Sequence, residues 1–237
     1  MFLYSFMLRL ITDFDGPIMD VSERYYRVYQ LCLEKTKRPE QTIRELPKSK
    51  FWAMKRANIP ERQIGIISGL DELQAQEFAR LRRQTVHNLP YLAYDRPFSD
   101  SVATLEKIQK QGVDLVVMTM RRVRELETAF EQYDLRRFFS SDRCYCLSDD
   151  YIKTADVKDK PLLMKKALQE LPTAAETWMV GDTEADIIAA KTHNIKVVGV
   201  LSGIRDREQL ERYQPDFIAN NLTEAIEIMM FAMAAIS

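Results

Sequence analysis

A strand-like run that ends in paired carboxylates and a tight turn constrains the fold of this chain most strongly. Residues 8–12 are mostly apolar, and they lead directly to Asp13, Asp15 and Gly16-Pro17. A short apolar run stopped by Gly-Pro is typical of a buried strand, and in an open α/β sheet ligands bind just beyond such strands. Two neighbouring carboxylates repel each other, and a bound Mg²⁺ is the usual solution for oxygen ligands. The stretch therefore predicts an anionic site at a strand end, with ordinary turn carboxylates as the alternative.

Helix-like and strand-like patterns alternate along the chain after residue 95. Apolar runs predict strands at 113–118, 144–147, 177–180, 196–200 and 216–219. Amphipathic segments predict helices at 101–111, 122–133, 161–170, 186–193 and 210–213, and a last helix from Thr223 onward. Strands that alternate with helices in this way indicate an α/β fold built on a doubly wound parallel sheet.

Residues 21–95 have a different character, because they contain no convincing strand. Helical patterns cover 21–37, 42–58, 60–68 and 71–87, with prolines and a glycine between them. A segment of this length is too long for a loop and must be structured in its own right. We therefore predict a helical cap domain at 21–95, inserted after the first strand above the carboxyl edge of the sheet. Residues 1–20 and 96–237 would form the core domain.

Composition excludes several classes of partner. The 237 residues are 46% apolar and 29% charged, which is the balance of a soluble globular protein. A net charge of −1 provides no basic field for nucleic acid or for an anionic membrane surface, and the apolar run at 226–236 is too short to span a bilayer. Three cysteines fit reduced thiols better than a disulfide framework, so we expect a cytoplasmic protein. Monomer and homodimer both stay open.

Further polar side chains follow the later strands. Thr119 ends the strand at 113–118, and Asp182 follows the strand at 177–180. Asp182 and Asp186 are four residues apart, so a helix that begins there would carry both on one face, and Asp182 beside Asp13 would complete an oxygen cage for Mg²⁺. Lys160 precedes Pro161, which is expected in the first turn of a helix. Each residue also has a purely structural interpretation. Lys160 could be a solvated lysine at a helix start, and Thr119 could hydrogen-bond the backbone at its strand end. Asp186 could be a carboxylate of a first helical turn, where the helix dipole stabilises negative charge.

Taken together, these motifs resemble those of the haloacid dehalogenase-like (HAD-like) hydrolase superfamily, in particular its phosphatase branch with a helical cap, of the phosphoglycolate phosphatase type. The resemblance covers residues 8–20 and 98–225. The matching motifs are Asp13-Phe14-Asp15-Gly16, the strand that ends in Thr119, Lys160-Pro161, and Gly181-Asp182 through Asp186. The implied fold is a HAD-like Rossmannoid core with a helical cap.

The resemblance implies a role for each catalytic position. Asp13 would be the nucleophile that forms an aspartyl-phosphate. Asp15 would protonate the leaving oxygen and then activate the water that hydrolyses this intermediate. Thr119 would bond the transferred phosphoryl oxygens, and Lys160 would neutralise charge on the nucleophile and the phosphoryl group.

The resemblance also implies a Mg²⁺ site and a substrate class. Asp13, Asp182 and the backbone carbonyl of Asp15 would hold the ion, with Asp186 in support. Dehalogenating members lack an aspartate at the position of Asp15, so the implied target is phosphorus, in a small phosphorylated metabolite. A phosphomutase of the β-phosphoglucomutase type and a non-catalytic binding or regulatory protein on the same fold are the competing hypotheses.

Several other charged residues are ambiguous in sequence. Arg121 and Arg122 could grip a substrate anion, but a solvent-facing helix start is the preferred interpretation. Three basic residues of the cap could meet a substrate, although surface charges are commoner: Lys50, Arg56 and Arg62. The two histidines, His87 and His193, have no partner pattern for a metal or a catalytic triad and are expected to be structural.

Overall fold

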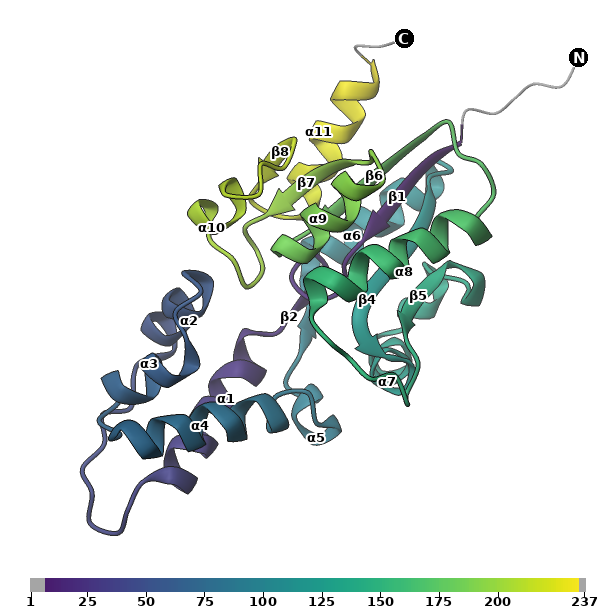
Figure 1. Cartoon of the computed structure of the whole chain (residues 1–237). Coiled ribbons are helices and arrows are strands. Elements are labelled where there is room, and N and C mark those ends of the chain that lie inside the picture. The colour runs from purple at the N-terminus through teal and green to yellow at the C-terminus, as the bar shows by residue number, and fades with distance from the viewer. Residues whose placement is uncertain (1–6, 235–237) are drawn as a thin grey trace, which may run out of the picture.

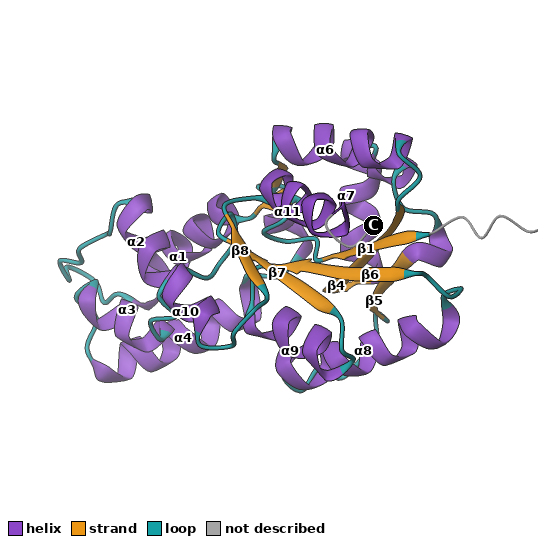
Figure 2. Ribbon diagram, turned by 90° about the horizontal axis from the view of Figure 1, so that it is seen from above, coloured by secondary structure: helices purple, strands orange, loops and turns teal. Residues whose placement is uncertain are grey.

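The core of the protein is a six-stranded sheet in which all strands are parallel. A computed structural model describes residues 7–234. The strand order is β5-β4-β1-β6-β7-β8 (Figure 2). The strands are β1 (Leu8–Thr12), β4 (Asp114–Arg122), β5 (Cys144–Leu147), β6 (Glu176–Gly181), β7 (Lys196–Val200) and β8 (Phe217–Ala219). Because Thr12 of β1 pairs with Val117 on one side and Val180 on the other, the residue after β1 emerges in the middle of the sheet.

Helices cover both faces of this sheet. On one face lie α6 (Ser99–Lys110), α7 (Val123–Tyr133) and α11 (Leu222–Ala234), and on the other lie α8 (Asp156–Glu170) and α9 (Glu184–Thr192), with the short α10 (Arg207–Glu211) (Figure 2). Alternate residues of each strand face opposite layers. Leu10 and Trp178 pack into one apolar core, and Ile11 and Met179 pack into the other. The predicted doubly wound sheet is therefore confirmed.

The segment after β1 is helical, and Figure 1 shows its first four helices to one side of the sheet, beyond the carboxyl ends of the strands. Its helices are α1 (Ser22–Thr36), α2 (Lys48–Arg56), α3 (Glu61–Ile67), α4 (Glu72–Thr85) and α5 (Leu89–Leu92). They enclose a separate apolar cluster, in which Tyr29 stacks on Phe51 at 4.6 Å between ring centroids. Two short antiparallel strands, β2 (Met19–Asp20) and β3 (Arg96–Pro97), connect this segment to the core.

Two helices begin at least five residues away from the expected start, each for a local reason. Only Lys48–Arg56 of the segment 42–58 is helical, because Pro47 disfavours helical backbone before it, and residues 41–47 form neither helix nor strand. Helix α8 begins at Asp156, so Pro161 lies inside the helix and not in its first turn. The Asp159 carboxylate accepts hydrogen bonds from the backbone and hydroxyl of Thr154, which anchor the additional turn.

Among residues 7–234, no helix has the length and apolar character needed to cross a bilayer.

Candidate active site

The end of β1 places Asp13 at the centre of the carboxyl edge. The backbone N–H of Asp13 donates to the Val180 carbonyl at 2.8 Å, and the N–H of Phe14 donates to Asp13 Oδ1 at 2.7 Å. The chain then turns at Gly16, whose φ of +92° favours glycine. A Cβ at Gly16 would lie 2.4 Å from Cγ of Asp182, so the turn also lets the two strand ends approach each other closely.

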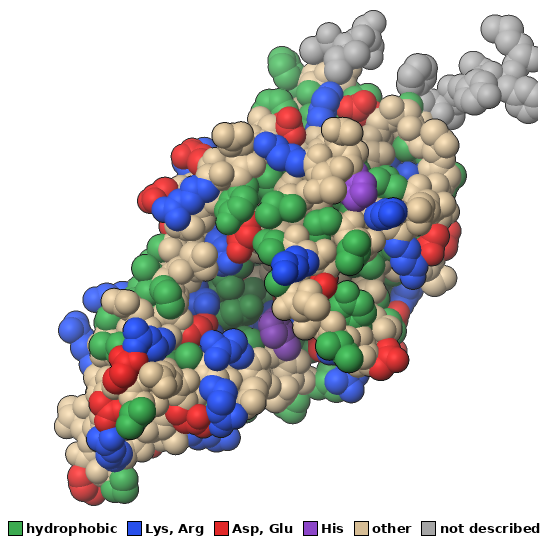
Figure 3. Space-filling view, viewed as in Figure 1, with side chains coloured by type: hydrophobic (Ala, Val, Ile, Leu, Met, Phe, Trp, Pro, Cys, Tyr) green, Lys and Arg blue, Asp and Glu red, His purple; other side chains and the backbone are tan. Residues whose placement is uncertain are grey.

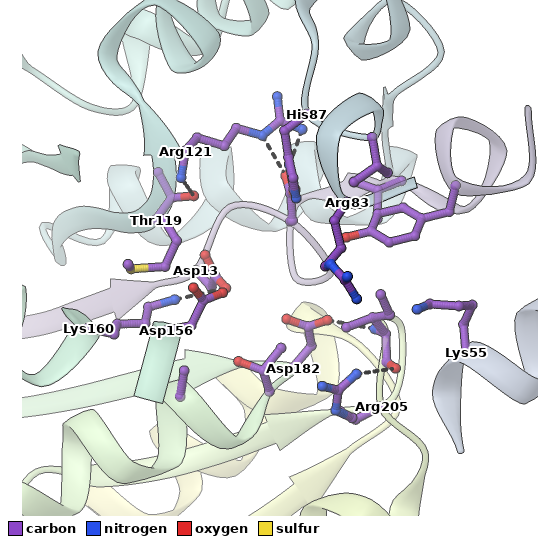
Figure 4. A pocket seen from close by; sticks show the side chains of 18 of the residues that line it. Asp13, Lys55, Arg83, His87, Thr119, Arg121, Asp156, Lys160, Asp182 and Arg205 are labelled. Atoms are coloured by element: carbon purple, nitrogen blue, oxygen red, sulfur yellow. Dashed lines mark hydrogen bonds and ion pairs between the residues drawn. The ribbon is translucent and has the colours of Figure 1, made fainter. Parts of the chain in front are cut away.

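Three buried carboxylates converge at this point. Ligand oxygens of Asp13, Asp182 and Asp186 all lie within 4.8 Å of one another. The Lys160 ammonium lies 2.9 Å from Asp13 Oδ2, as Figure 4 shows, and 2.5 Å from Asp186 Oδ1. All four side chains are buried. One lysine against three ionised carboxylates leaves an excess of two negative charges.

Burial and mutual repulsion disfavour this excess of charge. Burial raises the pKa of Asp13 to about 7, although the charge of Lys160 acts in the opposite direction. Burial also raises the pKa of Asp182 well above its usual value, and the charges of Asp13 and Asp186 add to the rise. A divalent cation would balance the two excess charges, and a set of carboxylate oxygens is the donor set that Mg²⁺ prefers. The residues therefore fit a Mg²⁺ site.

The loop after β6 and the loop after β7 orient two of these carboxylates. Asp186 Oδ2 accepts hydrogen bonds from the N–H and hydroxyl of Thr183, at 3.0 and 2.7 Å. Asp182 Oδ2 accepts one from the N–H of Ile204 at 2.6 Å. Helix α9 begins only at Glu184, so Asp182 lies outside it. The expectation that one helix face carries both Asp182 and Asp186 is therefore wrong. The two carboxylates lie close together because the end of β6 is adjacent to the first turn of α9.

Asp15 lies apart from the three carboxylates and is held by two arginines. Arg24 Nη2 donates to Asp15 Oδ2 and Arg121 Nε donates to Oδ1, both at 2.8 Å. Both arginines also contact the buried carboxylate of Asp95. Burial alone would raise the pKa of Asp15, but the charges of Arg121 and Arg24 lower it below its usual value. The expected solvent-facing role for Arg121 is therefore wrong, because this side chain is buried between two carboxylates.

The same edge of the sheet borders a cavity of about 490 Å³. Figure 3 shows the surface hollowed between the helical segment and the sheet. The predicted catalytic residues Asp13, Asp15, Thr119 and Lys160 all line this cavity, as does Asp182. The Thr119 hydroxyl accepts a hydrogen bond from the N–H of Arg121 at 3.2 Å, which orients it at the end of the buried part of β4.

Comparisons with known proteins show similarity to one family. A family model described as HAD-hydrolase-like matches residues 157–225. The chain is 28% identical over 131 residues to the pyrophosphatase PpaX of Bacillus mycoides, covering 53% of this chain and 56% of that protein. It is 26% identical over 167 residues to PpaX of Bacillus thuringiensis, covering 68% of this chain and 72% of that protein. These matches make the chain similar to the haloacid dehalogenase-like hydrolases.

Solved structures of low sequence identity share the fold of this chain. A predicted phosphatase of Clostridium difficile has a TM-score of 0.71 at 20% identity, over 94% of this chain and 98% of that one. A predicted β-phosphoglucomutase of Thermotoga maritima has a TM-score of 0.60 at 16% identity, over 94% and 99%. The sheet, its helices and the helical segment are thus a common architecture, and the likeness does not separate hydrolase from mutase.

The side of the cavity opposite the carboxylates contains residues that the sequence did not reveal. Helices α2, α3 and α4 contribute Lys55, Glu61, Arg82 and Arg83. A partial signal existed for Arg83, because Val86 and His87 follow it at helical spacing and also line the cavity. No local pattern distinguished Lys55 from its neighbours on α2.

The three basic residues that the sequence offered from this segment do not line the cavity. Lys50 is exposed, and Arg62 pairs with Glu72 on the surface. Arg56 donates to the carbonyl oxygen of Leu201 at 2.9 Å, which links α2 to the loop after β7. Of the two histidines, His193 bonds the Pro161 carbonyl oxygen as a structural residue would, whereas His87 lines the cavity with its ring edge-on to Tyr25.

Mg²⁺ is expected to stabilise the metal-free protein against heat, and more strongly at pH 8 than at pH 5. Metal ligands must be ionised, and protons compete for Asp13 below its pKa of about 7. At a hundredfold excess over Kd the gain in unfolding free energy is about 2.7 kcal/mol. Thermal melts with and without Mg²⁺ measure the gain, and the Asp182→Asn variant should lose most of it. An equal gain at both pH values would contradict binding by ionised carboxylates.

Proposed function

We propose that this HAD-like hydrolase is a Mg²⁺-dependent phosphatase that hydrolyses phosphomonoesters of small metabolites through an aspartyl-phosphate on Asp13. The observation that carries the proposal is the convergence of Asp13, Lys160, Asp182 and Asp186 at one strand end beside a cavity. Phosphoryl transfer depends mainly on position and on charge stabilisation, and this group of residues supplies both. The PpaX relatives, which are named pyrophosphatases, support phosphorus as the target.

In the first step, a carboxylate oxygen of Asp13 attacks phosphorus while the bond from phosphorus to the leaving oxygen breaks. The leaving oxygen takes a proton from Asp15, which must be protonated at this stage although Arg24 and Arg121 favour its ionised form. Thr119 donates a hydrogen bond to a phosphoryl oxygen. The Lys160 ammonium, 2.9 Å from Asp13, offsets the negative charge that the phosphoryl group brings. Mg²⁺ held by Asp13 and Asp182, with the Asp15 carbonyl and Asp186 in support, would stabilise charge on the phosphoryl oxygens.

In the second step, water attacks the phosphorus of the aspartyl-phosphate, and the bond to Asp13 breaks to release phosphate. Asp15 accepts the proton of this water. Its contacts with Arg24 and Arg121 favour the ionised carboxylate, which is the form that accepts a proton. The ionised Asp15 that these contacts favour is thus suited to act as the general base in the second step.

We also propose that residues 21–95 act as a cap domain over a core formed by residues 1–20 and 96–237. The cap helices supply one side of the cavity and the core supplies the carboxylates, so a bound ester would lie between them. Such a cap would exclude bulk water from the phosphoryl group and would select the rest of the substrate. The β2–β3 connection is the place where the two parts join.

The test is phosphate release from a panel of metabolite phosphates, including pyrophosphate, with and without Mg²⁺. We expect turnover that requires Mg²⁺ and disappears when a chelator is added. Analysis of the products formed from hexose phosphates distinguishes a hydrolase from a phosphomutase, because a mutase yields an isomerised sugar phosphate and no free phosphate. A folded protein that releases no phosphate from any ester would overturn the proposal.

A further inference from the structure

One side of the cavity carries an excess of positive charge far from the chemistry. We call it the cap wall, and it consists of Lys55, Glu61, Arg82 and Arg83 from helices α2, α3 and α4. Three of these four residues are cations and one is an anion, so the cap wall has a net charge of +2 when all are ionised. In the proposed function, none of these four residues has a role at the phosphoryl group.

Glu61 balances only part of this charge. Its Oε1 lies 2.5 Å from the Lys55 ammonium, and its Oε2 lies 2.8 Å from Nε of Arg82. Arg82 is buried and also donates to the backbone carbonyl of Tyr25 at 2.9 Å. Arg82 is therefore held by structural contacts. Among the described residues, Glu61 is the one carboxylate that pairs with Lys55, and it also pairs with Arg82.

Arg83 is the cation of the cavity that has no partner. Within residues 7–234 its guanidinium makes no hydrogen bond and no ion pair. The side chain is exposed, and Figure 4 shows its guanidinium pointing into the cavity toward the Lys55 ammonium. The other lysines and arginines that line the cavity all have carboxylate partners, for example Arg205 with Glu184 and Lys153 with Asp156.

An anionic group is the natural occupant of the space beside Arg83. A guanidinium binds a carboxylate or a phosphate through two parallel hydrogen bonds, and a lysine ammonium beside it adds a further donor. A neutral substrate tail would leave the excess charge of the cap wall without any complement. The scissile phosphoryl group cannot be this occupant in the proposed function, because it lies at Asp13, on the opposite side of the cavity.

We propose that the cap wall is a subsite for a second anionic group of the substrate, with Arg83 as its main contact and Lys55 as its second. The substrate would then be a small phosphate compound that carries a carboxylate or another phosphate at its far end. This inference rests on the proposed function, because it takes the reacting phosphoryl group to lie at Asp13.

The test is equilibrium binding of phosphonates, which keep the phosphoryl group but lack the ester bond. In the presence of Mg²⁺, alkylphosphonates are compared with phosphonates of the same chain length that end in a carboxylate or in a second phosphonate. We expect the best anionic tail to bind at least about tenfold more tightly than the matched alkyl tail, which is the usual value of a hydrogen bond to a charged group. The comparison of the two anionic tails identifies which group the subsite prefers.

Variants on α4 assign the effect to Arg83. In Arg83→Gln the affinity ratio between anionic and alkyl tails should fall close to one, and Arg83→Lys should retain part of it. Arg80→Gln is the matched control, because Arg80 lies on the same helix, does not line the cavity and already pairs with Glu77. It should leave the ratio unchanged. Thermal melts verify that each variant is folded, as expected for exposed positions.

The possible outcomes separate the two proposals. A wild-type ratio near one, or a ratio that Arg83→Gln leaves intact, overturns the subsite even if the protein releases phosphate from neutral-tailed esters. Selective binding of anionic tails without any turnover supports the subsite and overturns the phosphatase proposal. Failure to bind any phosphonate and to hydrolyse any ester overturns both.

Discussion

Replacement of Asp13 by asparagine is expected to lower kcat/KM for phosphate release by at least about 10⁴-fold, because the amide oxygen is a poor nucleophile toward phosphorus. The shape of the site should survive the change. The amide oxygen can still accept the hydrogen bond from the N–H of Phe14, which holds the carboxylate at 2.7 Å in the wild type. Burial raises the pKa of Asp13 to about 7, so a neutral side chain at this position costs the metal-free protein little stability. Phosphate release with Mg²⁺ on the best ester measures the effect.

A second aspartate variant controls for the loss of a carboxylate in general. Asp150 is exposed and does not line the cavity, so Asp150→Asn should keep full activity. Thermal melts should show that Asp13→Asn unfolds close to the wild-type temperature. If folded Asp13→Asn keeps more than about a tenth of the activity, Asp13 is not the nucleophile, since loss of a nucleophile costs far more than tenfold.

Local patterns in the sequence predicted the sheet and the residues at its carboxyl edge. The runs at 144–147 and 196–200 match β5 and β7 residue for residue, because each is a short apolar run bounded by polar or turn residues. Asp13 and Asp182 come together because parallel strands end at the same edge, so the position of a residue after its strand is enough to place it. Thr119 reaches the same cavity from within β4, because that strand continues to Arg122 and not only to residue 118 as expected. This part of the site needs no knowledge of how helices pack.

Ion pairs between residues on different elements could not be predicted from the sequence. Arg121 was expected at a solvent-facing helix start, but it is buried because Asp15 and Asp95 neutralise it from distant positions in the chain. Arg24 is buried against the same two carboxylates. The face that a charged helical residue presents depends on how the helices pack, and periodicity does not determine that packing. Arg82 and Arg83 therefore line the cavity while Arg56 and Arg62 do not, and helical periodicity alone does not separate the two pairs.

Replacement of Lys160 by methionine is expected to be the most destabilising of these changes in the absence of metal. Lys160 is buried and is the one cation in contact with Asp13 and Asp186 among the described residues. Removal of one partner of a buried ion pair costs about 3–5 kcal/mol of unfolding free energy. Turnover with Mg²⁺ should also fall about 10²- to 10³-fold, the usual cost of losing one group that stabilises charge in the transition state.

The pH dependence of this loss distinguishes charge from packing. Burial raises the pKa of Asp13 and of Asp182 in the folded protein. Both carboxyl groups therefore contribute to stability when they are protonated, and this contribution is complete below their pKa of about 4 in the unfolded chain. It is lost as the pH rises through their pKa in the folded protein. Without Lys160 the repulsion between ionised carboxylates grows, so the deficit of Lys160→Met relative to wild type should increase from pH 5 to pH 8. Urea unfolding at both pH values measures it, and Lys166→Met, at an exposed site on the same helix, should stay within about 0.5 kcal/mol of wild type. A deficit of equal size at both pH values would mean that Lys160 stabilises the protein by packing, and not by balancing the three carboxylates.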